Sequence, residues 1–536
     1  MSKGHSFLRG AAILGMAGVL VKILGAIYRI PLSNIIKSEG LGYYQTAYPF
    51  YVLLLTISTA GVPVAIAKLV SEKRAQGDFA GAHKVFKVAL VGLVGLGFLT
   101  SMVIAFGAGH IVNYLGNVNA YYALIALVPA LFFVPIMSAF RGFFQGRQSM
   151  FPTAISQITE QLFRVVTGLG LTYLLLDRGI PIAAGGASFG GSMGAIMGLA
   201  IIAIIYFKRR AEIMEEIAGS TIRREYSVGE IAKDLLLIAI PITIGAAIAP
   251  IMDTIDAALV LRRLQSINYT AAEANDLYGE LKGMAQTLVN LPQVFSIAIS
   301  MSLVPAISNA SARGSKQETS DLISSGIRMT LLIGLPSAIG LFVLSTPIVA
   351  LLYYNNPPEA IASVGNILAH LSLGVIFLTL VQALTAILQG LGKPFVPVRN
   401  LFIGAVAKII LTYVLTGIPA INVKGAAIST VAAYAIASTL NLLYVIYVAK
   451  AKLNLGAILM KPLVSAVGMG IIARLSYVVL AGPIGGRPAT LVAVLLGVIV
   501  YGVLLLLTGT LTDEDLDLIP KGDKVRKIVK RFDKWS

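Results

Sequence analysis

The sequence predicts an all-α polytopic membrane protein of about 14 transmembrane helices, built as two six-helix lobes in a parallel repeat plus two C-terminal helices. Of 536 residues, 57% are hydrophobic and only 12% are charged, whereas soluble domains are about 45–50% apolar and about 25% charged. The apolar runs are long and unbroken, unlike the strands of porins, which alternate over segments of about 10 residues. This composition excludes a water-soluble enzyme, a DNA-binding protein and a single-span receptor.

The individual spans follow from the apolar runs, because a membrane helix needs about 20 apolar residues. About fourteen such runs occur, at 8–36, 43–70, 84–108, 119–140, 152–176, 182–207, 232–260, 280–308, 322–345, 361–390, 396–416, 424–448, 460–481 and 488–509.

The domain organisation follows from a weak internal repeat. Three short matches recur in order after 240 to 244 residues, namely Val62-Pro63 with Val304-Pro305, Gln145-Gly146 with Gln389-Gly390, and Leu171-Thr172-Tyr173 with Leu411-Thr412-Tyr413. The offset contains six spans, so both copies have the same orientation, as in transporters with parallel repeats. We therefore predict a first lobe at 1–215, a second at 216–455, two added helices at 456–510 and a basic tail at 511–536.

Charge asymmetry predicts the topology. With both termini in the cytoplasm, 29 Lys and Arg residues lie inside and 6 lie outside, as the positive-inside rule requires. The net charge of +17 then reflects cytoplasmic loops facing anionic phospholipids, so a nucleic-acid partner is not needed. The tail from Lys521 onward is predicted to rest on the membrane surface.

The composition predicts no bound cofactor. The chain has no cysteine and only four scattered histidines, which argues against disulfides, Fe–S clusters, haem and zinc. It also has no phosphate-binding loop for ATP. Any pumping is therefore expected to use an ion gradient (Na⁺ or H⁺), the membrane potential or the gradient of the substrate.

Charged residues inside membrane spans are costly and commonly functional. Lys22 and Arg29 lie seven residues apart on one face of the first span, and Pro31 follows. Two cations on one face suit a phosphate or diphosphate. Alternatively, both pair with carboxylates, or Arg29 extends to the outer interface.

The fifth span carries a second polar strip. Glu160 and Arg164 form an i,i+4 pair, and Gln157 and Gln161 extend it. Together with Lys22 and Arg29, these four residues are the candidate lining of a headgroup cavity. The alternative is a self-neutralised structural pair that joins helices.

The seventh span carries Asp253 and Asp256, which share a face, and Lys408 lies in the eleventh. The carboxylates are candidates for binding a coupling cation or proton. A fixed Asp253–Lys408 ion pair is the alternative. Arg328 and Arg474 lie nearer helix ends and are expected to be packing or interfacial residues.

Four segments resemble a known family. They are Lys22-Ile-Leu-Gly-Ala-Ile-Tyr-Arg29-Ile-Pro31, Ala60-Gly-Val-Pro-Val-Ala-Ile-Ala-Lys68, Arg141-Gly-Phe-Phe-Gln-Gly146, and the run from Phe151 through Glu160 to Arg164. They resemble the polysaccharide transporter family of the multidrug/oligosaccharidyl-lipid/polysaccharide flippase superfamily. The last run resembles its Gram-positive branch, which contains the stage V sporulation protein B group and the MurJ-type lipid II flippases.

This resemblance implies fourteen helices, two lobes in a V and alternating access. It also implies export of an undecaprenyl-diphosphate-linked sugar from the inner to the outer leaflet. Arg29 matches the first-span arginine that faces the headgroup cavity, and Asp253 matches the aspartate associated with a sodium site. The chain departs from the Gram-negative pattern at Thr56-Ile57-Ser58 and Gln286-Thr287-Leu288, where further cavity arginines are expected. Lys408 is then a candidate internal counter-charge to Asp253.

Four functions remain open on the sequence. The leading hypothesis is a flippase for peptidoglycan lipid II. The others are a flippase for another lipid-linked exopolysaccharide or teichoic unit, a cation-coupled exporter of the multidrug type, and a non-transporting scaffold. The expected partners are the undecaprenyl-linked glycan lipid and the cell-wall assembly machinery, and a monomer is expected.

Overall fold

A computed structural model describes residues 3–222, 225–450 and 456–510, and these residues are helical with no β-strand. The chain divides into two compact units, Met1–Gly279 and Glu280–Ser536. This division differs from the predicted lobe boundary at 215/216, because α9 (Val228–Gln265) packs on α1, α2 and α3 of the first unit. The six-helix repeat itself stays a prediction.

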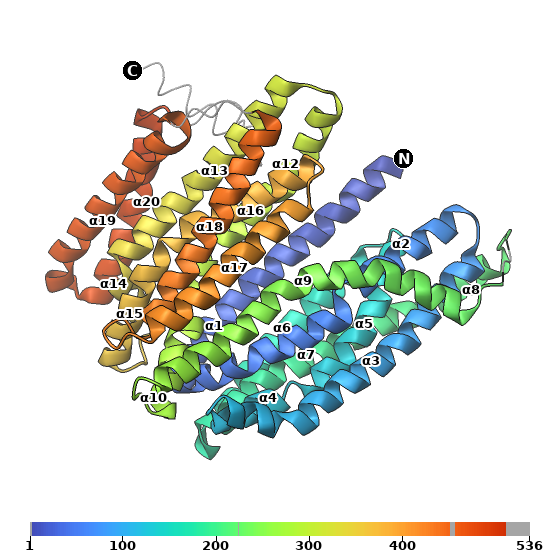
Figure 1. Cartoon of the computed structure of the whole chain (residues 1–536), viewed down its shortest axis with the longest axis horizontal. Coiled ribbons are helices and arrows are strands. Elements are labelled where there is room, and N and C mark those ends of the chain that lie inside the picture. The colour runs from blue at the N-terminus through green and yellow to red at the C-terminus, as the bar shows by residue number, and fades with distance from the viewer. Residues whose placement is uncertain (1–2, 223–224, 451–455, 511–536) are drawn as a thin grey trace. The chain divides into compact units, whose positions relative to one another are not determined.

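The first unit is a bundle of long helices (Figure 1). Its other helices are α1 (Lys3–Thr59), α2 (Val62–Ala75), α3 (Phe79–Tyr114), α4 (Tyr121–Ile125), α5 (Val128–Gly146), α6 (Phe151–Leu174), α7 (Ile180–Lys208), α8 (Arg210–Ala218) and α10 (Ala271–Tyr278).

The α1 segment consists of two helices joined at Lys37, whose φ of 56° and ψ of −164° interrupt the helix. This break falls between the first two predicted spans. The predicted span 43–70 is itself interrupted near Gly61, where α1 ends and α2 begins with Pro63 in its first turn. A side chain could not be placed at Gly61, because a Cβ there would lie 2.1 Å from the carbonyl oxygen of Ala239 in α9.

An aromatic core holds α3, α5 and α7 together. The ring of Phe86 lies 4.6 Å from that of Phe143 and 5.1 Å from that of Phe140, between centroids. His83 Nε2 lies 2.9 Å from the hydroxyl of Tyr206. Such offset aromatic contacts stabilise a core beyond their buried area.

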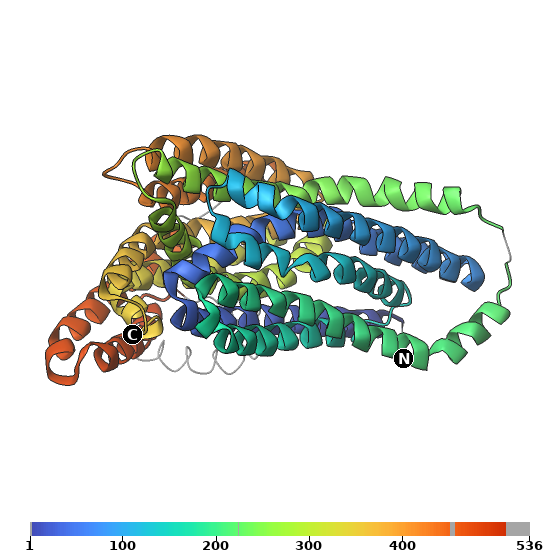
Figure 2. The same cartoon turned by 90° about the horizontal axis from the view of Figure 1, so that it is seen from below.

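Ion pairs tie α8 to one end of this bundle, beyond the last turn of α7 (Figure 2). Glu216 accepts hydrogen bonds from Arg74 at 2.5 Å and from Arg147 at 2.7 Å. Partial burial alone would raise the pKa of Glu216, but the two guanidinium groups outweigh it and lower that pKa below its usual value. The segment that leads out of α7 is therefore fixed to α2 and α5.

The second unit contains the remaining helices. They are a π-helical segment at Gly279–Ala285, which begins at the unit boundary, α11 (Gln286–Asn290), α12 (Gln293–Ala312), α13 (Lys316–Val343), α14 (Ser345–Leu352), α15 (Pro358–Ser372), α16 (Gly374–Gly390), α17 (Phe395–Thr416), α18 (Lys424–Ala449), a second π-helical segment at Gly456–Met460, α19 (Lys461–Ile484) and α20 (Gly486–Leu507). Its main apolar core lies between α12, α13 and α16 and includes Leu303, Ile327 and Leu384. α17 pairs with α18, and α19 pairs with α20 (Figure 1).

The chain is a multi-pass membrane protein. Within the described residues, eleven helices are long and apolar enough to span a membrane, or twelve if the bent pair α15 and α16 is one span. This set takes Ile13–Ala75 as one stretch despite the break at Lys37, and it omits α6, whose polar side chains include Glu160 and Arg164. The predicted number of fourteen is thus not established and stays a prediction. The predicted tail at 511–536 lies outside the described residues.

Candidate functional site

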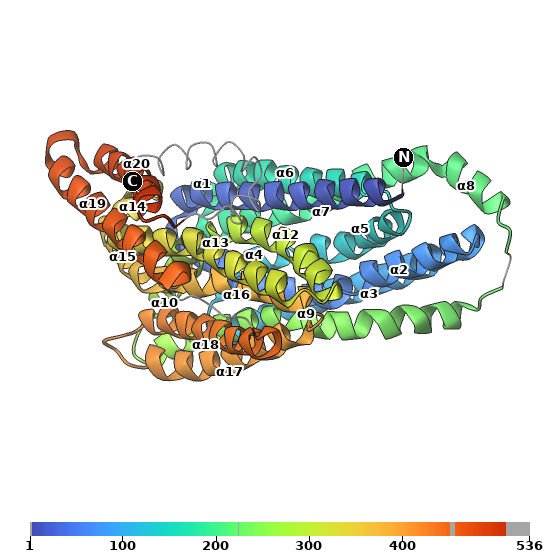
Figure 3. The same cartoon turned by 90° about the horizontal axis from the view of Figure 1, so that it is seen from above.

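The polar strip of the fifth predicted span lies on α6, which packs beside α1 and α7 (Figure 3). A stripe of glycines at every fourth position of α7 brings α6 close, at Gly186, Gly190, Gly194 and Gly198. A Cβ on Gly194 would lie 2.4 Å from the carbonyl oxygen of Glu160, and one on Gly190 would lie 2.5 Å from that of Arg164. The glycines therefore fix the position of the polar strip through backbone contact.

Glu160 is the centre of an ion-pair network. Arg164 Nη2 lies 3.6 Å from Glu160 Oε1, as the i,i+4 spacing predicts. Arg141, near the end of α5, donates from Nη2 to Glu160 Oε2 at 2.9 Å and also to Ser156 Oγ at 2.7 Å. The three charged side chains are only 15–18% exposed. One carboxylate is thus shared by two guanidinium groups, so the trio carries a net positive charge.

A cluster of tyrosines extends this site along α1. The rings of Tyr44 and Tyr48 stack at 5.5 Å between centroids, and Tyr51 follows at 5.7 Å from Tyr48. Arg164 lies within electrostatic range of all three. The buried hydroxyl of Tyr51 and the Nε of Arg164 have no hydrogen-bond partner among the described residues. Both are polar atoms that a bound polar group or a water molecule could satisfy.

Arg29 joins the same cluster. Tyr28 and Tyr44 each lie within electrostatic range of both Arg29 and Arg164. The hydroxyl of Tyr28 donates to the carbonyl of Ala187 in α7 at 3.0 Å, which anchors α1 next to Arg29. The structure therefore brings together Arg29 and Arg164, which the sequence assigned to separate spans.

The other predicted cavity residues differ in how deeply they are buried. Gln161 is 5% exposed, and its Nε2 lies 3.4 Å from the position of a Cβ on Gly25 in α1. Gln157 is half-buried. Lys22 and Arg29 are spaced to share one face of α1, but Lys22 is exposed whereas Arg29 is half-buried.

The predicted coupling residues lie in both compact units. Asp256 of α9 is 4% exposed, whereas Asp253, one turn earlier, is exposed. Lys408 is half-buried in α17 of the second unit, so an Asp253–Lys408 pair stays a prediction. No group of three or more His, Cys, Asp or Glu side chains suited to a metal ion occurs in the described residues.

Two features of this site were missed by the sequence reasoning. The predicted span 119–140 places Arg141 just beyond its cytoplasmic end, although its side chain is 15% exposed and pairs with Glu160. Tyr44, Tyr48 and Tyr51 were not considered, although their i, i+4, i+7 spacing predicts one helix face. The tyrosine spacing was a usable signal, whereas the Arg141 pairing depends on how α5 packs on α6.

A bundle of apolar helices with buried cations and broken spans is typical of membrane transporters. The profile of the polysaccharide biosynthesis protein family matches residues 7–311, and that of the MatE family matches residues 282–414. The chain therefore belongs to the polysaccharide biosynthesis protein family, within the multidrug/oligosaccharidyl-lipid/polysaccharide flippase superfamily.

Relatives from Bacillus subtilis cover most of the chain. The uncharacterized membrane protein YabM is 30% identical over 99% of this chain and 98% of its own length. The lipid II flippase MurJ is 30% identical over 80% of each chain, and stage V sporulation protein B is 29% identical over 82% of this chain and 83% of its own. These relatives group the chain with transport proteins and not with enzymes.

Solved structures show the same fold. A lipid II flippase MurJ in an inward closed conformation aligns with a TM-score of 0.69, at 16% identity, over 92% of this chain and 98% of the other. An inward-facing multidrug resistance MATE family transporter aligns with a TM-score of 0.61, at 14% identity, over 79% and 98%.

Proposed function

We propose that this protein is a flippase that moves a lipid-linked oligosaccharide across the membrane by alternating access, without ATP hydrolysis. The observation that carries the proposal is the cluster of Arg29, Arg141 and Arg164 inside an apolar helix bundle, where Glu160 is shared by two guanidinium groups. A diphosphate headgroup must lose water to cross the bilayer. Guanidinium groups replace that hydration with two-pronged bonds to phosphate oxygens.

We propose undecaprenyl-diphosphate-linked lipid II as the substrate, moving from the inner to the outer leaflet. Support comes from the relative named lipid II flippase MurJ, which matches 80% of this chain. The similar match to stage V sporulation protein B makes another lipid-linked glycan the main alternative. Comparing lipid II with a lipid-linked teichoic precursor in one transport assay separates the two.

A multidrug-type exporter is a second candidate, because the MatE profile matches residues 282–414. The positive charge of the first-unit site favours an anionic substrate over the organic cations that a carboxylate-lined cavity would bind. Transport of a cationic dye by the reconstituted protein, with no transport of a lipid-linked glycan, would select this alternative.

For coupling, we propose one of two roles for Asp253 and Lys408. Either Asp253 binds the coupling cation or proton, or the two residues form an internal charge pair. Asp253 is exposed and Lys408 is half-buried in the structure, and a charge within a membrane span is costly unless it is paired. If the residues only neutralise each other, Asp253→Asn impairs transport and adding Lys408→Gln partly restores it. A double variant no better than the single variants favours binding of Na⁺ or H⁺, which transport at varied Na⁺ and pH then identifies.

The test of the main proposal is Arg29→Ala in proteoliposomes that contain fluorescent lipid II. We expect flipping to fall by at least about tenfold, because hydrogen bonds to charged groups contribute roughly 1.5–3 kcal/mol, while abundance stays normal. Arg29→Lys should keep part of the activity, since a point charge lacks the planar fork. Lys22→Ala should be milder, because Lys22 is exposed.

Arg178→Ala is the matched control, since this arginine is exposed in the turn between α6 and α7. Normal flipping by a normally abundant Arg29→Ala protein would refute the cationic-cavity mechanism. Equal losses in Arg29→Ala and Arg178→Ala would point to a general charge effect and also refute it.

A further inference from the structure

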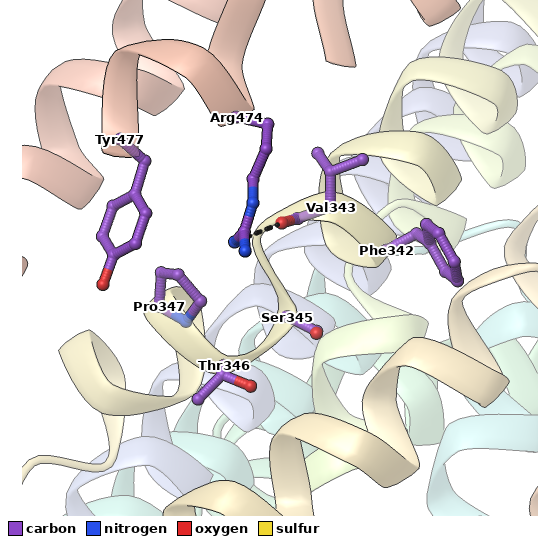
Figure 4. Close-up of a pocket in the computed structure, with 7 residues that line it drawn as sticks. All are labelled: Phe342, Val343, Ser345, Thr346, Pro347, Arg474 and Tyr477. Atoms are coloured by element: carbon purple, nitrogen blue, oxygen red, sulfur yellow. Dashed lines mark hydrogen bonds between the residues drawn. The ribbon is translucent and has the colours of Figure 1, made fainter. Parts of the chain in front are cut away.

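A second polar pocket lies in the second compact unit, where α19 crosses the break between α13 and α14 (Figure 4). Its cavity volume is about 520 Å³, and it is lined by Phe342, Val343, Ser345, Thr346, Pro347, Arg474 and Tyr477. None of these residues belongs to the cation cluster around Glu160, which lies in the first compact unit. The predicted span 322–345 ends within two residues of the end of α13 at Val343, but α14 was not predicted, so the short helix after the break is a finding of the structure.

Among the described residues, Arg474 is the only charged side chain that lines this pocket. Its side chain points from α19 toward the helix break, and Nη1 donates to the carbonyl oxygen of Val343 at 3.3 Å (Figure 4). Its other described contact is the ring of Tyr477, 5.9 Å from the guanidinium carbon. In the described part of the chain, Arg474 has no carboxylate partner.

The structure places Arg474 farther from a helix end than the sequence indicated, and its side chain is exposed. Arg474 lies ten residues before the end of α19 at Ile484, which is about 15 Å along the axis. α14 runs eight residues beyond the break, or about 12 Å. A cation at such depth is costly unless it meets an anion or water, and interrupted backbone is tolerated there where it lines a polar cavity.

The opposite wall of the pocket supplies hydrogen-bond donors. Ser345 and Thr346 begin α14, and the residue before them, Leu344, provides no side-chain cap. The first amides of a helix have no partner within it, and they favour anions together with the helix dipole. Beneath the pocket, Leu344, Ala473 and Ala493 form an apolar floor, against which Val343 and Tyr477 pack.

We propose that this pocket binds the phosphate group of a membrane lipid, with Arg474 as the cation and the hydroxyl and amide groups of Ser345 and Thr346 as further donors. The combination of an arginine with no carboxylate partner among the described residues, two hydroxyl side chains and an adjacent apolar surface fits a phosphate head with acyl chains alongside. A guanidinium group binds phosphate oxygens through two parallel hydrogen bonds. The proposal does not depend on what the protein transports.

The test is native mass spectrometry of the purified, delipidated full-length protein, titrated with phosphatidylglycerol. A phosphate-free diglycosyl lipid with the same acyl chains is the reference ligand. We expect Arg474→Gln to weaken phosphatidylglycerol binding by about tenfold and to leave glycolipid binding unchanged. Arg474→Lys should be intermediate, because a lysine keeps the charge but loses the fork.

Arg487→Gln is the matched control. Arg487 carries the same charge near the start of α20 and lies 5.5 Å from the ring of Tyr354, outside the pocket. Equal loss of binding in Arg474→Gln and Arg487→Gln, or no loss in either, would overturn the proposal. If Arg474→Gln fails to fold, Ser345→Ala combined with Thr346→Val tests the site with the charge intact, and unchanged binding there would overturn it.

A second titration identifies the source of the phosphate. Undecaprenyl diphosphate is compared with phosphatidylglycerol at equal concentration in the wild-type protein and in Arg474→Gln. If the wild-type protein prefers one of the two lipids and Arg474→Gln loses that preference, the pocket is a phosphate site and the preferred lipid is its ligand. Loss of flipping in Arg29→Ala leaves this result unaffected, so failure of the lipid site and failure of the flippase proposal are distinguishable.

Discussion

Arg141 of α5 donates a 2.9 Å hydrogen bond to Glu160 of α6, and it lies in the last turns of α5, just beyond the predicted end of that span at 140. The same carboxylate receives Arg164 from one turn further along α6. Glu160 thus holds two guanidinium groups in place on adjacent helices, and the positive charge of the site depends on it.

Removing the carboxylate and removing an arginine change the net charge of this network in opposite directions. Glu160→Gln leaves two buried cations facing each other, and Arg141→Gln leaves the carboxylate with Arg164 alone. We expect each to lower the melting temperature, with a loss of about 3–5 kcal/mol for a broken buried pair. The double variant Glu160→Gln/Arg141→Gln should be more stable than the Glu160→Gln single variant, because it buries one cation fewer. Thermal unfolding in detergent measures this, and strictly additive losses would show that the two residues do not interact.

The glycine stripe of α7 should not accept larger side chains. Gly194→Leu places atoms where the backbone of Glu160 lies, so α6 must move away and the network must open. We expect a loss of at least about 1–3 kcal/mol from overpacking, seen as low abundance or a lowered melting temperature. Gly170→Leu on α6 is the control, because no atom lies within 4 Å of its Cβ position. Equal tolerance of both substitutions would contradict the close packing.

One carboxyl outside the membrane spans should make stability depend on pH. Burial raises the pKa of Asp276 in α10 from 3.8 to about 6, the nearby charges of Glu39 and Glu273 act in the same direction, and a hydrogen bond from Asn275 opposes them. The folded protein therefore binds a proton more tightly than the unfolded chain, so this residue's contribution to stability falls as pH rises from about 4 to about 6.

We expect Asp276→Asn to stabilise the protein at pH 7 and to make no difference near pH 3.5, as measured by unfolding temperature across this range. Glu273→Gln is the control, because hydrogen bonds from Thr270 lower the pKa of this exposed carboxyl. If Asp276→Asn stabilises the protein equally at both pH values, the raised pKa of Asp276 is contradicted.

The topology can be tested with single cysteines, since the chain has none of its own. With cytoplasmic termini, Asn355→Cys should react with an impermeant maleimide added outside intact cells, and Lys316→Cys should react only after lysis. Both positions are exposed. Asn117 is unsuitable, because its side chain is buried and donates to Asn275 at 2.9 Å. External labelling of Lys316→Cys would reject the predicted arrangement.

The helical membrane fold was predictable because long apolar runs have few other solutions in a bilayer. The breaks within predicted spans were harder to predict. The break near Gly61 falls inside the predicted span 43–70. The end of α13 at Val343 agrees with the predicted end at 345, but α14 was not predicted, because the apolar run continues past it. The α6 strip was visible because four polar residues in an apolar helix are conspicuous. The pairing of Arg141 with this strip could not be predicted, because it depends on how α5 and α6 are rotated and shifted along their axes relative to each other, and no local sequence pattern encodes this.

The spacing of the α7 glycines also has a consequence for motion. A surface that repeats every four residues looks nearly the same after a shift of one repeat, which is about 6 Å along the helix axis. Gly186, Gly190, Gly194 and Gly198 therefore form a track along which α6 could advance by one step and meet an equivalent groove. The hydrogen bond from Arg141 of α5 to Glu160 of α6 joins α6 to α5, and α5 itself packs on α7. This bond therefore selects one step of α6 on that track through α5, which contacts both helices.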